Sequence, residues 1–162
     1  MGVAAAQQGR LDEAADRHRD ALAAYEAVGS VEGAAFTYAC LGFLATRKGD
    51  TEPAMELCRS SLAKAALGHE RRATALAVEG LAAAHALAGD AQAAACLLGV
   101  ASQLRGVGET TVPWMSSELT RVETSCRSLL GDATYDAAHA SGRQQADTIV
   151  TRLLSGEQPL AG

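Results

Sequence analysis

Histidine and cysteine, the residues that most often carry metal or acid–base chemistry, are few in this chain and widely separated. His69-Glu70 matches the first two positions of the HExxH zinc motif, but Ala73 stands where the second histidine is required. A structural or catalytic zinc site needs three or four ligands at suitable spacing. We therefore interpret His69-Glu70 as polar residues at the start of a helix.

The other histidines, His18, His85 and His139, have no neighbouring ligand in the sequence. His85 falls at a packing position of an amphipathic pattern, where a partly buried histidine is the ordinary role. A metal site that combines His85 with Cys96 stays open as an alternative, although no ligand spacing supports it. No two cysteines form a CxxC pair, so we expect reduced, buried side chains in a cytoplasmic protein: Cys40, Cys58, Cys96 and Cys126.

Two short motifs fail the tests for nucleotide binding and for nucleophilic catalysis. Gly106-Val107-Gly108 lacks the preceding strand and the third glycine of a dinucleotide loop, so it predicts a connector. Ser116-Ser117-Glu118 follows a proline and is typical of a helix start, and a serine nucleophile would need a base and an oxyanion hole. The sequence thus predicts no catalytic residue, no cofactor and no metal.

Composition narrows the classes of protein that remain. Of the 162 residues, 48% are hydrophobic, largely alanine, and only 4% are aromatic, which is typical of helices packed through small side chains. The net charge of −5 argues against direct binding of nucleic acid. No apolar run reaches the roughly 18 residues of a membrane span, and no secretory signal precedes the first helix.

A repeated phrase indicates how the elements are organised. It recurs at intervals of 40 residues: GRLDEA at 9–14, GDTEPA at 49–54 and GDAQAA at 89–94. The leading glycine ends one helix by adopting a positive φ. Asp50 or Asp90 can then cap the next helix, and Pro53 suits its first turn. The closing alanine lets the two helices of a hairpin lie close together. An exact period of this kind predicts a helical repeat array.

Apolar spacing of three and four places the individual helices. We expect helices at about 2–8, 11–28, 31–48, 52–67, 69–88 and 91–105, then one from Pro113 and others at about 132–141 and 143–154. The domain divisions that follow are helical repeats at 1–106, a loop at 107–112, capping helices at 113–155 and a flexible tail at 156–162. The first repeat is truncated, so the chain is either a piece of a longer array or an array with a worn N-terminal cap.

The repeat resembles the tetratricopeptide repeat. Leu41-Gly42, Gly49 and Ala54 match the Leu-Gly, turn and alanine positions of that family, and Tyr38 stands where the family has tryptophan. The common aromatic on the second helix is replaced, by His18, Cys58 and Leu98. The period exceeds the usual length of about 34 residues, which implies longer helices. The resemblance implies an all-α, right-handed solenoid of antiparallel helix hairpins with a C-terminal helical cap.

The segment from residue 93 onward has a narrower resemblance. It contains AAACLLGVASQLRGVG at 93–108, Pro113, Leu130-Gly131 and YDAAHASGR at 135–143. This segment resembles the end of the tetratricopeptide region in large actinobacterial-type transcriptional regulators, of the LuxR/MalT-like or SARP-like kind. Ser102 and His139 depart from the usual glutamate and tryptophan. The resemblance implies a parent chain that combines this array with an ATPase module and a DNA-binding or adenylate-cyclase-like domain. Because this sequence contains no GxxxxGKS or GxxxxGKT motif, we expect nucleotide and DNA binding to belong to other parts of that parent chain.

The resemblance also predicts where a partner binds, since the first helix of each tetratricopeptide hairpin lines a concave groove. By that register the groove residues are Phe36, Ala39, Phe43, Arg47, Leu76, Glu79 and Ala83. Such a groove suits an amphipathic helix or an apolar peptide. The alternative is that Phe36 and Phe43 only pack between repeats. Trp114 is either an interface anchor or, as we prefer, a plug over the end of the solenoid.

Three hypotheses for function follow. The first is a non-catalytic interaction and sensor module of a bacterial transcriptional regulator, which holds a protein, a peptide, an inducer or the ATPase domain of its own parent chain. The second is a self-associating scaffold, such as a homodimer, built on the exposed half-repeat. The third, an enzyme with a helical pocket, requires converging titratable groups that the sequence does not reveal.

Overall fold

The structure is a computed structural model that describes residues 2–105 and 113–160, and within those ranges it is helical without strands. The helices are α1 (Gly2–Gln7), α2 (Leu11–Ala27), α3 (Val31–Lys48), α4 (Thr51–Leu67), α5 (Arg71–Leu87), α6 (Ala91–Arg105), α7 (Pro113–Leu130), α8 (Asp132–Gln144) and α9 (Ala146–Leu154). The all-α prediction is confirmed. The predicted loop at 107–112 lies outside the described residues.

The turns between the hairpin helices follow the predicted glycine pattern. Gly9, Gly49 and Gly89 have φ values of 75°, 88° and 86°, a region that residues with a side chain rarely enter. Asp90 Oδ1 accepts a hydrogen bond from the Ala93 amide at 3.0 Å, so this cap forms as expected. Asp50, in contrast, makes no side-chain cap bond at the start of α4.

The start of α5 differs from the prediction by two residues. His69 adopts a left-handed conformation with φ of 54°, which is incompatible with a continuing right-handed helix. The chain therefore turns at His69, and α5 begins at Arg71 with Glu70 as its N-cap residue. His69 belongs to this turn.

Small residues bring successive helices into close contact. Ala14, Ala54 and Ala94, the closing residues of the repeated phrase, are each 0% exposed. A Cβ added to Gly42 of α3 or to Gly80 of α5 would lie 2.3 Å or 2.5 Å from the Cys58 sulfur of α4. Three consecutive helices therefore depend on glycine to reach their packing distance.

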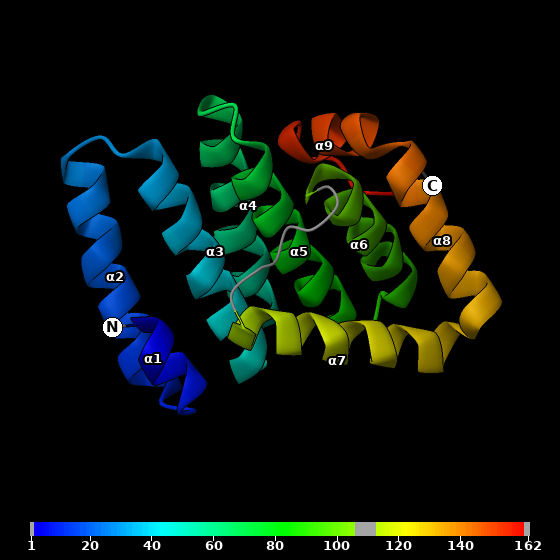
Figure 1. Cartoon of the computed structure of the whole chain (residues 1–162), viewed down its shortest axis with the longest axis horizontal. Coiled ribbons are helices and arrows are strands. Elements are labelled where there is room, and N and C mark those ends of the chain that lie inside the picture. Colours follow the sequence, from blue (N-terminus) through cyan, green and yellow to red (C-terminus); the bar gives the residue numbers. More distant parts are fainter. Residues whose placement is uncertain (1, 106–112, 161–162) are drawn as a thin grey trace.

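Helices α2 to α6 stand side by side in chain order (Figure 1). Each contacts the next, and α3 also contacts α5, so the first helices of two successive hairpins are neighbours. This is the packing expected of stacked hairpins. A right-handed solenoid stays a prediction. No helix of the described residues is long and apolar enough to cross a membrane.

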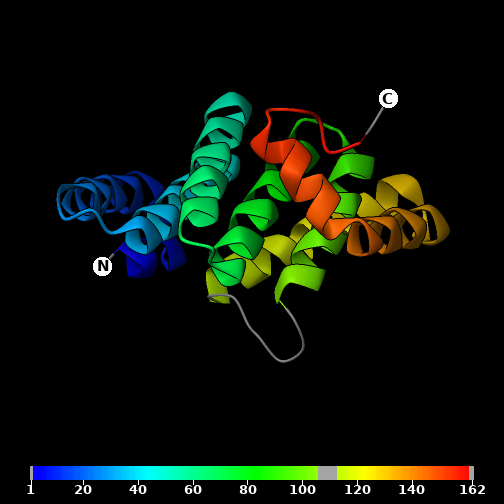
Figure 2. The same cartoon turned by 90° about the horizontal axis from the view of Figure 1, so that it is seen from above.

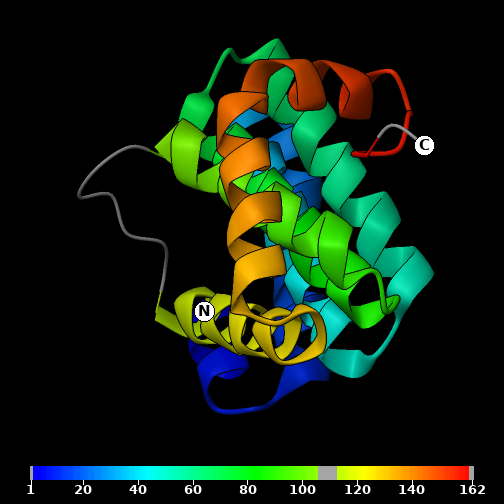
Figure 3. The same ribbon diagram turned by 90° about the vertical axis from the view of Figure 1, so that its right-hand side faces the viewer.

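The three C-terminal helices surround the α5–α6 pair on several sides. In Figure 1, α7 runs along the lower edge, and it contacts α1, α5, α6 and α8. Seen from above in Figure 2, α9 lies near α4, which it contacts, and α8 lies on the outer side of α6. Figure 3 shows α8 connecting α7 below to α9 above. These helices thus extend along the repeats as far as α1.

Two apolar clusters hold these layers together. One joins α3 to α7 through fully buried side chains such as Phe43, Leu44 and Met115. The other joins α4, α5, α6 and α9, and α9 contributes Ala146, Ile149 and Leu153 to it. In the segment predicted as a flexible tail, Pro159 is buried and Leu160 packs against this second cluster.

Candidate functional site

The structure places the seven predicted groove residues in different environments. Those that belong to the buried cluster shared with α7 are Ala39, Phe43, Leu76 and Ala83. Phe36 is 36% exposed. Arg47 is exposed, and its Nη1 donates to the Ala6 carbonyl of α1 at 2.9 Å. Glu79 is buried and paired with Arg105. The seven side chains do not form one continuous exposed surface.

Helix α7 of the same chain lies against part of the predicted groove. The rings of Trp114 and Phe43 form a T-shaped pair, with centroids 6.0 Å apart at an interplanar angle of 80°. Trp114 is 7% exposed and Phe43 is 0% exposed. A partner could reach Phe43 only after α7 moves, so binding of another molecule to these seven residues stays a prediction.

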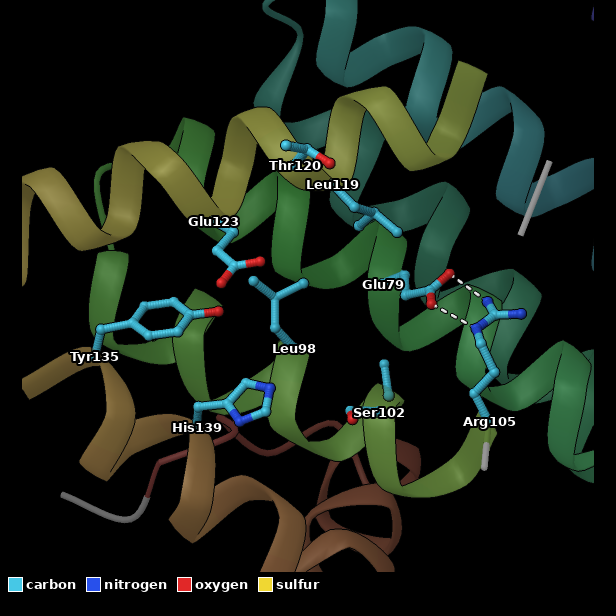
Figure 4. A pocket seen from close by; sticks show the side chains of 10 residues that line it. Glu79, Leu98, Ser102, Arg105, Leu119, Thr120, Glu123, Tyr135 and His139 are labelled. Carbon is cyan, nitrogen blue, oxygen red and sulfur yellow. Dashed lines mark hydrogen bonds and ion pairs between the residues drawn. The ribbon is translucent and has the colours of Figure 1, made fainter. Parts of the chain in front are cut away.

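A separate pocket of about 360 Å³ lies where α5 and α6 meet α7 and α8. Figure 4 shows the side chains that line it: Glu79, Leu98, Ala101, Ser102, Arg105, Leu119, Thr120, Glu123, Tyr135 and His139. Its volume falls in the range of small-molecule sites, roughly 300–1,000 Å³. Because all four helices contribute side chains, a molecule bound here would contact both the repeats and the C-terminal helices.

The close crossing of α6 and α8 positions one wall of the pocket. A Cβ on Gly99 would lie 2.0 Å from the His139 carbonyl oxygen, and a Cβ on Gly142 would lie 1.9 Å from the Cys96 carbonyl oxygen. Backbone therefore packs on backbone at both contacts. The consequence is that His139 and Tyr135, one turn earlier on α8, are held beside α6.

Glu79 and Arg105 form the opposite wall as a buried, two-point ion pair. Arg105 Nε donates to Glu79 Oε1 at 2.9 Å, and Arg105 Nη2 donates to Oε2 at 2.5 Å. The Arg105 side chain is only 12% exposed and the Glu79 side chain only 7% exposed. Burial raises the pKa of Glu79, and the two bonds from Arg105 oppose that rise. Each charge is thus largely satisfied by the other.

Tyr135 is enclosed by groups from α7 and from its own helix, α8. The Arg127 guanidinium carbon lies 4.0 Å from the centroid of the Tyr135 ring, and the His139 ring stacks at a centroid distance of 5.8 Å. Burial and the nearby Glu123 carboxylate raise the pKa of Tyr135 to about 12. Burial lowers the pKa of His139. Near neutral pH, therefore, the tyrosine keeps its proton and the imidazole is mostly uncharged.

Arg127 of α7 is shared by three carboxylates. Its Nε donates to Glu123 Oε1 at 3.1 Å, and its Nη1 donates to Asp132 at 3.2 Å and to Asp136 at 2.9 Å. These bonds raise the pKa of Arg127, that from Glu123 most strongly. One positive charge facing three negative charges leaves this cluster with an excess of negative charge at the pocket's edge.

Several polar atoms in the pocket have no hydrogen-bond partner among the described residues. They are the Tyr135 hydroxyl, both ring nitrogens of His139 and Oε2 of Glu123. In Figure 4, these three side chains point into the same space. A nucleophilic site needs a nucleophile hydrogen-bonded to a base, and none of the lining residues is paired in that way. The arrangement suits recognition of a polar group.

Only part of this pocket could be predicted from the sequence. Glu79 is the one predicted groove residue that lines it. Tyr135 belongs to the segment that carries the regulator resemblance, His139 is also one of the isolated histidines, and Glu123 was not predicted as a site residue. Two signals pointed to them: the Glu123 to Arg127 spacing, which places opposite charges on one helix face, and a histidine in place of the usual tryptophan at position 139.

The remaining histidine and cysteine candidates are buried packing residues. His85 is 5% exposed, and its Nδ1 lies 3.5 Å from Asp90 Oδ2. The four cysteines are free and buried, as predicted. Within residues 2–105 and 113–160, no three His, Cys, Asp or Glu side chains are grouped so that they could hold a metal ion.

The chain was compared with models of protein families, with curated proteins and with solved structures, and none of them matches it.

Proposed function

We propose that this chain is a non-catalytic sensor and interaction module of a bacterial transcriptional regulator. The observation that carries the proposal is the pocket between α5, α6, α7 and α8, with its unpaired polar side chains. A small molecule held there would stabilise the packing of the C-terminal helices on the repeats, because it would contact both. A shift in that packing is a means by which an inducer could alter a bound protein or a neighbouring domain.

Hydrogen–deuterium exchange on the purified chain tests the binding step. A library of small organic compounds of mixed charge is screened, and every binder is mapped. We expect binders to protect amides of α7 and α8 together with those of α5 and α6. If compounds bind only elsewhere, or if exchange of α7 and α8 never changes, the chain does not act as this sensor.

A second candidate function is a self-associating scaffold. It is favoured by large apolar side chains exposed near the ends of α2 and α4, where Val28 is 78% exposed and Leu67 is 72% exposed. Exposed apolar side chains support self-association where they gather in one patch. Light scattering over a range of concentrations decides between the two, because a chain that stays monomeric at high concentration is not a scaffold.

A further inference from the structure

The unpaired atoms of the pocket include three hydrogen-bond acceptors, beside the donors of the Tyr135 hydroxyl and of one His139 ring nitrogen. Glu123 offers Oε2, which its bond to Arg127 leaves free, and a neutral His139 offers one ring nitrogen. The Tyr135 hydroxyl can both donate and accept. In Figure 4, the Glu123 carboxylate comes down from α7, while the rings of Tyr135 and His139 reach the same space from α8. Acceptors gathered in this way match a group that carries several N–H donors.

The charges around the pocket also favour a cation. Glu79 and Arg105 neutralise each other through two bonds on one wall. On the other wall, Arg127 is already shared by Glu123, Asp132 and Asp136. Arg105 is the one arginine among the lining residues, and Arg143 acts on His139 from outside the lining. An incoming anion would therefore find no unpaired cationic side chain in the lining itself. An incoming ammonium group would meet the excess carboxylate charge.

Apolar side chains separate these two walls. Leu98 lies at the centre of the pocket, with Leu119 of α7 beside it (Figure 4), and Ala101 completes this apolar part. A ligand that fills the space needs a hydrocarbon or aromatic body next to its charged group. A strongly hydrated metal ion or a compact polyamine would leave this surface without a partner.

We infer that the pocket binds a small amphipathic amine, whose protonated nitrogen donates to Glu123 and His139 and whose apolar body lies over Leu98 and Leu119. This inference rests on the proposed sensor function and names its class of ligand. Tyr135 completes the polar end by accepting from the amine or donating to a second polar atom of the ligand. Hydrogen bonds to a carboxylate are stronger than those between neutral groups, so Glu123 contributes most.

Three probes of similar size and different charge test the class of ligand. They are phenethylamine, 2-phenylethanol and 3-phenylpropionate, each titrated into the ¹⁵N-labelled full chain while amide chemical shifts are followed by NMR. We expect phenethylamine to shift amides of α6, α7 and α8, with an affinity about tenfold or more above that of the neutral alcohol. The carboxylate should bind more weakly than either.

Two carboxylate variants provide a matched comparison. Glu123→Gln removes the carboxylate with the free oxygen in the pocket, and we expect it to weaken phenethylamine binding about tenfold while the affinity for the alcohol stays the same. Asp132→Asn removes another partner of Arg127 that does not line the pocket, and it should change amine affinity by less than about twofold. Equal loss in the two variants would overturn the inference, because it would indicate general charge attraction.

A third variant tests the location without altering any charge. Ser102→Phe places a ring in the pocket from α6, and it should abolish the shifts caused by all three probes. If phenethylamine still binds this variant with unchanged affinity, the pocket is not its site. If the alcohol or the carboxylate binds best and Ser102→Phe blocks it, the sensor function stands and the amine inference fails. If no probe and no library compound reaches the pocket, both fail.

Discussion

Gly99 of α6 and His139 of α8 are in backbone contact, so close that a Cβ on Gly99 would lie 2.0 Å from the His139 carbonyl oxygen. The contact has a consequence for the pocket, because the His139 side chain is one of its walls. The Leu-Leu-Gly and Gly-Arg segments of the C-terminal half therefore have a physical role. They supply the two glycines at which α6 and α8 cross.

The first prediction concerns this crossing. Gly99→Ala or Gly142→Ala forces two helix backbones apart, since the obstructing atoms are carbonyl groups that cannot rotate away. We expect each variant to lower the free energy of unfolding by about 1–3 kcal/mol, the usual cost of overpacking. Chemical denaturation measures the loss, and hydrogen exchange should show faster exchange in α8.

Gly68→Ala is the matched control for these variants. Gly68 ends α4 with φ of −83°, and a Cβ there would meet its nearest atom at 3.5 Å, which is ordinary contact. We expect its stability to stay within about 0.5 kcal/mol of the parent chain. If Gly99→Ala and Gly142→Ala behave like this control, the two helices do not depend on the glycine contacts.

Local rules were sufficient to predict the helices but not how the C-terminal helices pack. Gly49 and Gly89 stop helices because of their backbone freedom, a property of single residues that sequence reveals directly. The position of α7 across α1 and α5 depends on long-range contacts such as Trp114 with Phe43. Nothing in the spacing of either residue indicates that pairing.

The difference between local rules and long-range contacts also explains why only part of the pocket was predicted. Glu79 could be placed on an inward helix face by its register, but its partner Arg105 lies 26 positions away on another helix. Glu123 and His139 line the same pocket because α7 and α8 both pack on α6, which α8 crosses at glycines. Convergence of these titratable groups therefore depends on tertiary geometry, which the spacing of Glu123 and Arg127 and the histidine at position 139 do not reveal.

The second prediction concerns the ion pair in the pocket wall. Glu79→Gln leaves Arg105 buried without its counter-charge, and we expect a loss of roughly 3–5 kcal/mol in the free energy of unfolding. The double variant Glu79→Leu/Arg105→Met removes both charges and should recover much of this loss. Denaturation of the single and double variants measures the coupling. A double variant no more stable than Glu79→Gln would mean that the pair contributes by its own attraction.

The third prediction concerns pH. Burial lowers the pKa of His18, His85 and His139 below the ordinary value of 6.5. When folding lowers the pKa of a histidine, its contribution to the free energy of unfolding is fully present above the pKa of the unfolded state. That contribution is lost as the pH falls through the lower pKa of the folded state. We therefore expect the free energy of unfolding to decrease as the pH is lowered from about 7.5 to about 5.5.

Single histidine variants test this origin. His85→Gln should reduce the pH dependence, because that buried side chain no longer has to be protonated at low pH. His69→Asn is the control, since His69 is exposed in the turn before α5 and asparagine tolerates its positive φ. A pH dependence that is identical in the parent chain and in His85→Gln would exclude His85 as a contributor.

The last prediction concerns the attachment of α7. Trp114 is buried against Phe43, yet its indole Nε1 has no hydrogen-bond partner among the described residues. Trp114→Phe keeps a ring at the contact and removes the unpaired donor, so we expect a loss below about 1.5 kcal/mol. Trp114→Ala leaves a cavity and should cost roughly 3–5 kcal/mol.

Leu129→Ala, on the same helix but 68% exposed, should change stability by no more than about 0.5 kcal/mol. Because far-ultraviolet circular dichroism follows unfolding without the tryptophan signal, all three variants can be compared directly. If Trp114→Phe is as damaging as Trp114→Ala, the indole nitrogen has a partner in solution, and α7 is held by a hydrogen bond as well as by the aromatic contact.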